Sequence, residues 1–333
     1  MPVFLLQRLI KTITIDAKEF VYMALPQISK WRKFYSTALT FWIPFKAYRR
    51  AFRGILQLGV RKYFRVLRND KKTKFKYELA IGAITKNEGP YIKEWIDYHI
   101  LVGVQKFYIY DNESTDDTAK ILKPYIKKGI VEYVYFPGTR MQNAAFVDII
   151  NKHCDETRWL APIDLDEFLV PVKHKTLPDF LHTLPSNAAC VIASWVLYGS
   201  SGHKTKPTGL VIENYKYRRI KPAGCKSIIN PRLIVRQFNA HVNFFAGFIV
   251  DCNGKKLGYI DQSNNPPSID LLRCNHYKTK SYEEYVERCE RGGGYSGNSR
   301  KAEKFARWEY YNSDNIYDDI MDKYIDQLKK FKI

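Results

Sequence analysis

The sequence predicts an α/β fold: a mostly parallel sheet flanked by helices, preceded by a basic helical extension. Two observations support this prediction. From about residue 78 onward, short apolar runs alternate with helical patterns, as in βαβ units. The chain also carries 54 Lys and Arg against 34 Asp and Glu, and most of that excess lies before residue 77. The 333 residues are therefore expected to divide into a basic segment, 1–76, and a domain, 77–333.

The charge of +20 is unevenly distributed along the chain. Residues 1–76 hold 18 Lys and Arg but only three acidic residues, so the domain itself is close to balance. A composition of 45% hydrophobic and 15% aromatic residues supports a sizeable core and excludes a disordered or collagen-like chain. The six cysteines are widely spaced, which disfavours a zinc ribbon or a dense disulfide scaffold.

Residues 31–68 predict a basic amphipathic helix that starts near Pro44. Its apolar side chains recur at steps of three and four residues: Phe45, Tyr48, Phe52, Ile55, Gly59 and Tyr63. Its opposite face is basic. Such a helix can lie on an anionic membrane surface or can pack its apolar stripe on the domain, and the sequence leaves both open. Nucleic acid is not an expected partner, because no nucleic-acid-binding module signature accompanies the basic segment.

Charged residues interrupt the apolar stretch within residues 1–25, so we expect no secretory signal. No apolar run reaches the roughly 18 residues of a membrane-spanning helix. We therefore expect a cytoplasmic protein that is peripheral on the cytoplasmic face of the membrane, attached through residues 31–68.

The elements of the domain follow from local signals. Apolar runs at 79–84, 106–110, 130–136 and 158–163 predict four buried strands. Helical patterns at 91–101 and 142–153, with a third helix opened by the Ser/Thr and acidic residues at 114–117, connect them. In doubly wound sheets ligands bind beyond the carboxyl ends of the strands. Neither a GxGxxG after the first strand nor a P-loop is present, which argues against a dinucleotide oxidoreductase and a P-loop NTPase.

Asp164 and Asp166 directly follow the fourth predicted strand. Alternate residues of an extended backbone project the same way, so both carboxylates can point into one site. Such hard oxygen donors suit Mn²⁺ or Mg²⁺, which neutralise the phosphates of a nucleotide. A glycoside hydrolase would instead need its two carboxyl groups roughly 5–10 Å apart, which makes it the less favoured interpretation.

Six blocks resemble a GT-A glycosyltransferase, and more narrowly glycosyltransferase family 92 and bacterial enzymes close to family 2. They are ITKNE (84–88), EWIDYH (94–99), YDNESTD (110–116), WLAPIDLDEF (159–168), SWVLYGSSGH (194–203) and NHYKTKS (275–281). The resemblance covers roughly residues 78–325. It implies a GT-A-like, Rossmann-type sheet, with a donor half at about 77–170 and an acceptor half with a C-terminal lid at about 171–333. By its residues, the glycine-rich tract at 291–297 is either a flexible lid over the donor phosphates or a plain linker, and the sequence leaves both open.

The resemblance implies metal-dependent transfer of a sugar from a nucleotide-diphosphate donor, a UDP-sugar, with inversion. The implied acceptor is a glycan or lipid-linked glycan, in surface polysaccharide synthesis by a bacterial enzyme at the membrane. A non-catalytic, membrane-associated scaffold with a transferase-like domain is the alternative.

The resemblance also assigns roles to individual residues. The metal ligands would be Asp164, Asp166 and His276. The residues that bind the nucleotide-sugar would be Thr85, Asn87, Glu88, Asp111, Arg140, Gln142, Asp164 and His203. The candidates for the catalytic base are Glu167, beside the metal pair, and Asp251, which reads equally well as a turn residue.

Overall fold

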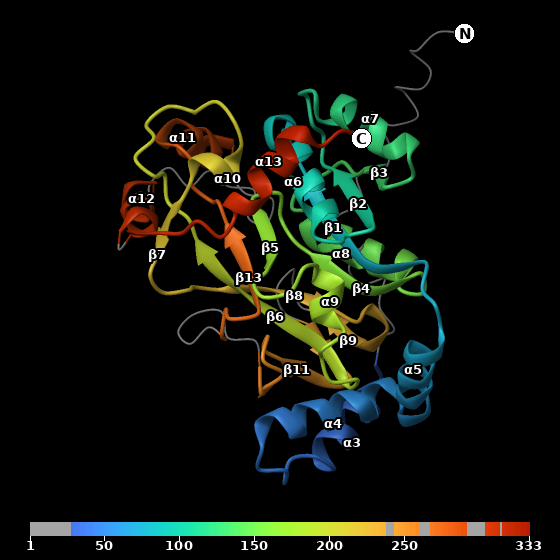
Figure 1. The fold of residues 1–333 in the computed structure, drawn as a ribbon. Helices are drawn as coiled ribbons and strands as arrows, with labels where there is room; N and C mark the ends of the chain where they lie inside the picture. The colour runs from blue at the N-terminus through green and yellow to red at the C-terminus, as the bar shows by residue number, and fades with distance from the viewer. Residues whose placement is uncertain (1–27, 238–242, 260–266, 292–303, 314) are drawn as a thin grey trace, which may run out of the picture.

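The computed structural model describes residues 28–237, 243–259, 267–291, 304–313 and 315–333. Its centre is a ten-stranded sheet with helices on both faces (Figure 1). The main strand order is β12-β11-β6-β8-β4-β1-β2-β3, and β13 joins β6 to β5. The predicted α/β class with a mostly parallel sheet is confirmed. Residues 292–297 of the candidate lid lie outside the described part of the chain.

The first half of the domain is the predicted βαβ series. Its elements are β1 (Tyr77–Thr85), α6 (Gly89–Leu101), β2 (Lys106–Asp111), α7 (Thr118–Lys127), β3 (Val131–Tyr135), α8 (Gln142–His153) and β4 (Thr157–Pro162). Strands β3, β2, β1 and β4 are parallel neighbours in that order. Helix α7 begins four residues later than predicted. The carboxylate of Asp116 accepts hydrogen bonds from the backbone N–H groups of Gly89 and Thr118, so this acidic segment forms a loop between two helix starts.

Strand β2 shows how the sheet becomes buried on both faces. Phe107 and Ile109 pack into the core on the side of α6, where they meet Trp95. Tyr108 and Tyr110 point the other way, into the core beneath α8. Side chains alternate across a strand, so a continuous apolar run is what a strand covered on both faces requires.

The second half of the domain adds mixed strands. They are β5 (Glu167–Pro171), β6 (Ala188–Leu197), β8 (Cys225–Ile229), β11 (Phe248–Val250), β12 (Lys256–Leu257) and β13 (Leu272–His276). Strand β8 is antiparallel to both β4 and β6, and β13 is parallel to β6. Therefore β1 to β4, β6 and β13 all end at one edge of the sheet, where β5 and β8 begin. We call this the carboxyl edge.

Shorter elements complete the domain. They are α9 (Leu177–Leu181), α10 (Val211–Asn214), β7 (Tyr217–Arg219), η2 (Pro231–Leu233), β9 (Ile234–Gln237), β10 (Asn243–Phe245), α11 (Tyr282–Arg291), α12 (Lys304–Asn312), β14 (Asn315–Tyr317) and α13 (Asp322–Lys330). Among the described residues, every helix is too short or too polar to cross a bilayer.

The basic segment forms three helices rather than one: α3 (Lys30–Ala38), α4 (Lys46–Leu58) and α5 (Val60–Lys72). Helix α4 ends at Gly59, whose φ of 105° is not helical. Glycine suits this position because residues with a side chain rarely adopt a positive φ. Gly54 lets α4 approach the body closely: a Cβ there would lie 1.9 Å from the carbonyl oxygen of Phe245. Arg50 donates to the carbonyl of Asn243 at 3.2 Å. The predicted stripe is thus split, with Phe52 exposed and Tyr63 buried.

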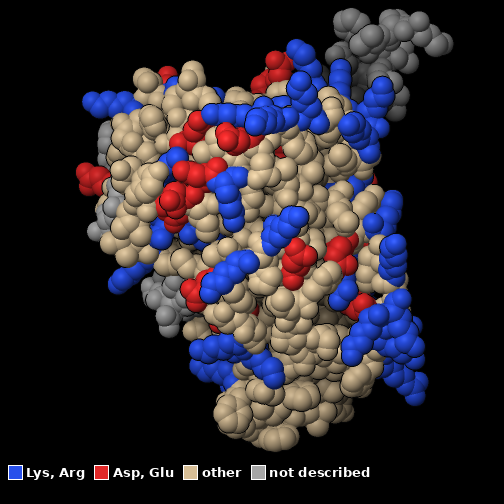
Figure 2. All heavy atoms as spheres, viewed as in Figure 1, with Lys and Arg blue, Asp and Glu red and all other residues tan. Residues whose placement is uncertain are grey.

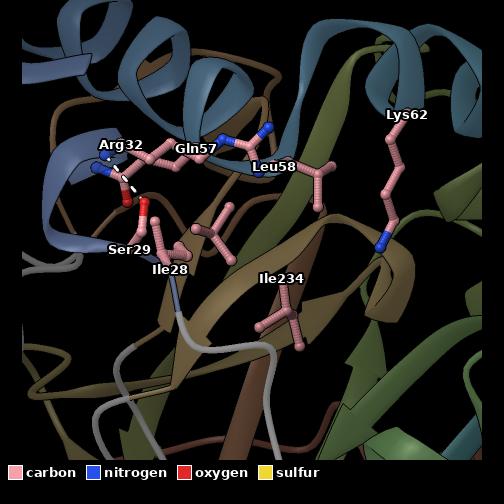
Figure 3. A pocket seen from close by; sticks show the side chains of 8 residues that line it. Ile28, Ser29, Arg32, Gln57, Leu58, Lys62 and Ile234 are labelled. Carbon is pink, nitrogen blue, oxygen red and sulfur yellow. Dashed lines mark hydrogen bonds between the residues drawn. The ribbon is translucent and has the colours of Figure 1, made fainter. Parts of the chain in front are cut away.

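A pocket lies between these helices and β9 (Figure 3). Its lining residues are Ile28, Ser29, Arg32, Gln57, Leu58, Lys62, Ile234 and Val235. None of the predicted site residues lines it. Helix α4 packs beside β11, which pairs with the start of β6 at Ala188, whereas the carboxyl edge lies at the other end of β6, at Leu197.

Candidate active site

The carboxyl edge gathers polar side chains from strands that are distant in sequence. Thr85 and Asp111 end β1 and β2 and are direct partners in the β ladder. His276 is the last residue of β13, and it pairs with Glu167, the first residue of the neighbouring antiparallel strand β5. Asp164 lies in the connection between β4 and β5. The topology therefore brings residues separated by almost 200 positions into one site.

Asp166, Glu167 and His276 form the candidate metal centre. Their ligand atoms lie within 4.8 Å of one another, and all three residues are buried. His276 Nε2 is 3.4 Å from Asp166 Oδ1, and His276 Nδ1 is 4.0 Å from Glu167 Oε1. Asp166 Oδ1, Glu167 Oε1 and His276 Nδ1 have no hydrogen-bond partner. Buried polar atoms are ordinarily satisfied, and two carboxylate oxygens beside an imidazole suit Mn²⁺ or a similar divalent ion, so these residues fit a metal.

The charge states of Asp166 and His276 agree with that fit. Burial lowers the pKa of His276, although Asp166 opposes the shift, so the imidazole is neutral and offers a lone pair. Burial by itself would raise the pKa of Asp166, but the charge of Arg288, together with the contact with His276, outweighs it and holds that pKa well below its usual range. Asp166 is therefore an anion at neutral pH.

A tight turn between β4 and β5 separates the two aspartates. Glu167 N–H donates to the Asp164 carbonyl at 3.1 Å, and Asp164 N–H donates to Glu167 Oε2 at 2.9 Å. The backbone is thus not extended here, which corrects the expectation that Asp164 and Asp166 project together. Asp164 accepts instead from Gln142 Nε2 at 2.8 Å and from Lys226 Nζ at 2.9 Å, and lies outside the cluster.

Lys226 is a buried cation that we did not predict. It lies on β8, is 1% exposed, and its Nζ is also 3.4 Å from Glu167 Oε2. Burial would lower its pKa, but Asp164 and Glu167 outweigh this and raise it, so Lys226 stays charged. Burial raises the pKa of Glu167 to about 8 despite Lys226. The sequence did carry a signal that could have identified this buried cation: Lys226 lies within the otherwise mostly apolar run of residues 225–229.

Arg288, on α11, is the second cation that sequence reasoning missed. Its guanidinium forms an ion pair with Asp166 and donates to the carbonyl of Lys278 at 2.8 Å. The pair raises the pKa of Arg288 although burial opposes it. Nothing in the local sequence distinguishes this arginine from its neighbours, because the contact spans 122 residues.

The predicted nucleotide-binding residues lie at the ends of β1 and β2. Thr85 is buried, and its Oγ1 has no hydrogen-bond partner. Asn87 has φ of 55°, and its Oδ1 accepts from Thr115 N at 2.7 Å. Glu88 immediately precedes α6. Asp111 accepts from Tyr133 Oη at 2.6 Å. Thr85 and Asp111 are thus neighbours in the β ladder, and Asn87 contacts the loop that follows Asp111.

The remaining predicted residues are dispersed. Gln142 reaches Asp164, whereas Arg140 is exposed in the loop before α8, with φ of 59°. The ring of His203 stacks edge-on against Tyr215, with centroids 5.6 Å apart. Asp251 Oδ1 accepts from the N–H groups of its own turn between β11 and β12. That turn follows a strand paired with the start of β6, which corrects the expectation that Asp251 lies at the site.

Asp318 supports β13 next to the metal cluster, and its charge predicts an acid dependence of stability. It accepts from both terminal nitrogens of Arg273 at 2.9 Å and pairs with Arg218. Burial would raise the pKa of Asp318, but these arginines lower it to about 2, below the ordinary 3.8. The ionised group therefore stabilises the fold above about pH 4, and this contribution is lost as the pH falls toward 2.

We expect wild type to have a larger free energy of unfolding than Asp318→Asn near neutral pH. Acidification should reduce this difference by about 2 kcal/mol. Urea unfolding of both proteins between about pH 5 and pH 2.5 measures this change. A difference that does not vary with pH would contradict the assignment.

Comparison with known proteins places the chain in a family. The family model described as "Glycosyltransferase family 92" matches residues 85–321. A glycosyltransferase family 92 protein of Arabidopsis thaliana is 30% identical over 54% of this chain and 33% of its own length. One from Ricinus communis is 28% identical over 64% of this chain and 37% of its own. The beta-1,4-galactosyltransferase galt-1 of Caenorhabditis elegans is 26% identical over 62% of this chain and 49% of its own.

Solved structures give weaker likenesses. S. aureus TarS in complex with UDP matches with a TM-score of 0.31 at 13% identity, over 47% of each chain. Glucosyl-3-phosphoglycerate synthase from Mycobacterium tuberculosis, with Mn²⁺, UDP-glucose and phosphoglyceric acid, matches at 0.29 and 16% identity, over 50% of this chain and 61% of that one. At these scores the likeness carries no argument about function.

The family match rests on sequence over most of the domain. It begins at Thr85, the end of β1, and runs through β13 to Met321, so it contains the whole candidate metal centre. The chain spans about a third of the length of the first two curated relatives. Because the matched residues make up more than two thirds of the sequence, the chain belongs to glycosyltransferase family 92.

Proposed function

We propose that the protein transfers a sugar from a UDP-sugar to a hydroxyl group of a glycan acceptor, with a divalent cation at the carboxyl edge. Membership of family 92 supports sugar transfer. The observation that carries the proposal is the set of three buried acceptor atoms without partners, on Asp166, Glu167 and His276. Buried polar atoms are ordinarily hydrogen-bonded, and a cation bound among these three, whose ligand atoms lie within 4.8 Å of one another, would satisfy them together.

Asp166, Glu167 and His276 would hold the cation, and Mn²⁺ suits this mixed oxygen and nitrogen set. When bound, the cation supplies a Lewis acid that neutralises charge on the diphosphate leaving group. Asp164 and Lys226 fix the turn that presents these ligands.

Thr85, Asn87 and Asp111 are proposed to bind the nucleoside, since Thr85 and Asp111 end β1 and β2 at the carboxyl edge and Asn87 contacts the loop that follows Asp111. Thr85 Oγ1 is buried without a partner, as expected of a group that awaits a ligand. Glu88, Arg140, Gln142 and His203 remain proposed donor-sugar or phosphate contacts on the strength of the family resemblance.

The acceptor hydroxyl must lose a proton during transfer. Glu167 is 0% exposed, so we assign it to the metal rather than to an acceptor that approaches from solvent. Asp251 follows β11, whose last residue pairs with Val191, six residues before β6 ends at the carboxyl edge. We therefore propose neither Glu167 nor Asp251 as the catalytic base. Inversion stays a prediction, and NMR of the product tests it by showing the anomeric configuration.

A donor screen tests the function. Purified protein is incubated with UDP-galactose, UDP-glucose and UDP-N-acetylglucosamine, each with Mn²⁺, with Mg²⁺ or with EDTA. Because one relative is a beta-1,4-galactosyltransferase, UDP-galactose is the first donor to try. We expect UDP release, and thermal stabilisation by UDP, only when metal is present.

Each other result of the screen has a distinct meaning. Stabilisation by UDP and metal without turnover of any donor, with glycan or lipid-linked glycan acceptors added, would favour the non-catalytic scaffold. Cleavage of glycans without a nucleotide would indicate a glycoside hydrolase. No response to UDP and metal by either readout would overturn the proposal.

A further inference from the structure

The first described helices carry a large exposed aromatic surface. Seven side chains on α3 and in the loop that leads to α4 are each between 58% and 71% exposed: Trp31, Phe34, Tyr35, Leu39, Phe41, Trp42 and Phe45. We call this surface the aromatic tip. Figure 2 shows it as the uncharged lower end of the molecule. A contiguous patch of large apolar side chains is rare on a soluble monomer and marks an interaction surface.

The charge around the aromatic tip indicates the partner. Residues 30–69 contain 11 Lys and Arg and no Asp or Glu. Lys and Arg side chains flank the tip in Figure 2. This surface therefore carries one sign of charge. Two copies of it would repel each other, whereas an anionic surface would attract it, with each basic group near a bilayer contributing on the order of 1 kcal/mol.

The side chains of the tip suit a lipid interface. Tryptophan is enriched at the boundary between headgroups and acyl chains, where its ring is apolar and its N–H stays hydrated. Trp31 and Trp42 are 71% and 68% exposed, so both rings are available without unfolding. We propose that the aromatic tip inserts into an anionic lipid bilayer while the surrounding basic side chains contact the lipid headgroups.

The tip is held in place before any contact with lipid. Gln57 Nε2 of α4 donates to Ser36 Oγ of α3 at 2.9 Å, within a buried contact. Arg53 Nε donates to Thr40 Oγ1 at 3.2 Å, and Arg49 donates to the carbonyl of Phe41 at 3.2 Å. Helix α4 itself is docked on the body through Gly54. A preformed surface loses little conformational entropy on binding.

This surface differs from the one that the sequence pattern predicted. The predicted stripe ends at Tyr63, which faces the body and is 5% exposed. Val66, in the next turn of α5, also faces the body and is 8% exposed. Those side chains cannot reach a bilayer. The membrane contact is therefore made by α3 and residues 39–45, not by one continuous helix over 31–68.

Vesicle binding of the full chain tests the inference. We expect co-sedimentation with vesicles of phosphatidylcholine containing about a third phosphatidylserine, weaker binding to phosphatidylcholine alone, and loss of binding as salt rises. The double variant Phe41→Ser/Trp42→Ser should bind at least tenfold more weakly. Its matched control is Ile220→Ser/Tyr317→Ser, which replaces two side chains that are 55% and 56% exposed elsewhere, and should bind like wild type.

Trp42 fluorescence gives a second readout. Brominated lipids should quench wild type more strongly than Trp42→Ser. Two results would overturn the inference: unchanged vesicle binding by Phe41→Ser/Trp42→Ser, or no binding of wild type to anionic vesicles. A wild-type dimer that Phe41→Ser/Trp42→Ser converts to a monomer, without lipid binding by either, would show instead that the tip joins two copies. None of these three results depends on whether the protein transfers a sugar.

Discussion

Replacing Asp166 by asparagine is expected to lower the rate of sugar transfer by at least about 100-fold. The substitution preserves the size of the side chain but removes the negative charge that the buried Oδ1 offers beside His276 Nε2, 3.4 Å away. Without that anion the site loses its strongest attraction for a divalent cation. Initial rates of UDP release at saturating donor measure the effect, and thermal shifts with Mn²⁺ report metal binding independently of turnover.

A matched control separates metal binding from the ion pair, because Asp166 also pairs with Arg288. Asp318→Asn removes a second aspartate from its arginine partners but leaves all three residues of the metal cluster in place. Both variants should lose stability, but only Asp166→Asn should lose the stabilisation by Mn²⁺. Wild-type rates and an intact Mn²⁺ response in Asp166→Asn would show that the cluster is not the metal site.

The parallel half of the fold could be predicted because each of its elements is encoded locally. The run 106–110 became β2 and the pattern 142–153 became α8 at the predicted bounds or within one residue. The start of α7 could not be placed this way, since Asp116 bonds to the backbone of Gly89, 27 residues away. The single helix over 31–68 failed at Gly59, whose positive φ serves the docking of α4 and α5.

The sequence predicted site residues only where side chains able to bind a metal follow or end a predicted strand. The placement of Asp166 and His276 together followed from a motif at a strand end and from family resemblance. Asp164 turned away because the chain reverses between β4 and β5, a geometry that a two-residue spacing does not determine. Lys226 and Arg288 complete the charge balance from 62 and 122 residues away, and no local pattern specifies such partners.

Replacing Lys226 by methionine is expected to destabilise the protein by about 3 kcal/mol at neutral pH. Its Nζ is the buried cation between Asp164 Oδ2, at 2.9 Å, and Glu167 Oε2, at 3.4 Å. Methionine fills a similar volume but leaves Asp164, and Glu167 wherever it is ionised, without that charge. Asp164 is a third exposed and regains water, which keeps the loss at the lower end of values for broken buried pairs. Urea unfolding measures the free energy.

The pH dependence of this loss identifies its electrostatic origin. Glu167 already has a pKa raised to about 8 by burial, and removing Lys226 raises it further. A carboxyl group whose folded pKa lies above its unfolded value destabilises the fold progressively as the pH rises between those two values. The deficit of Lys226→Met should therefore be larger near pH 8 than near pH 5, where Glu167 is protonated and needs no cation. Lys226→Arg, which keeps the charge, should show a deficit that does not change with pH. A Lys226→Met deficit equal at both pH values would mean that Lys226 contributes through packing instead.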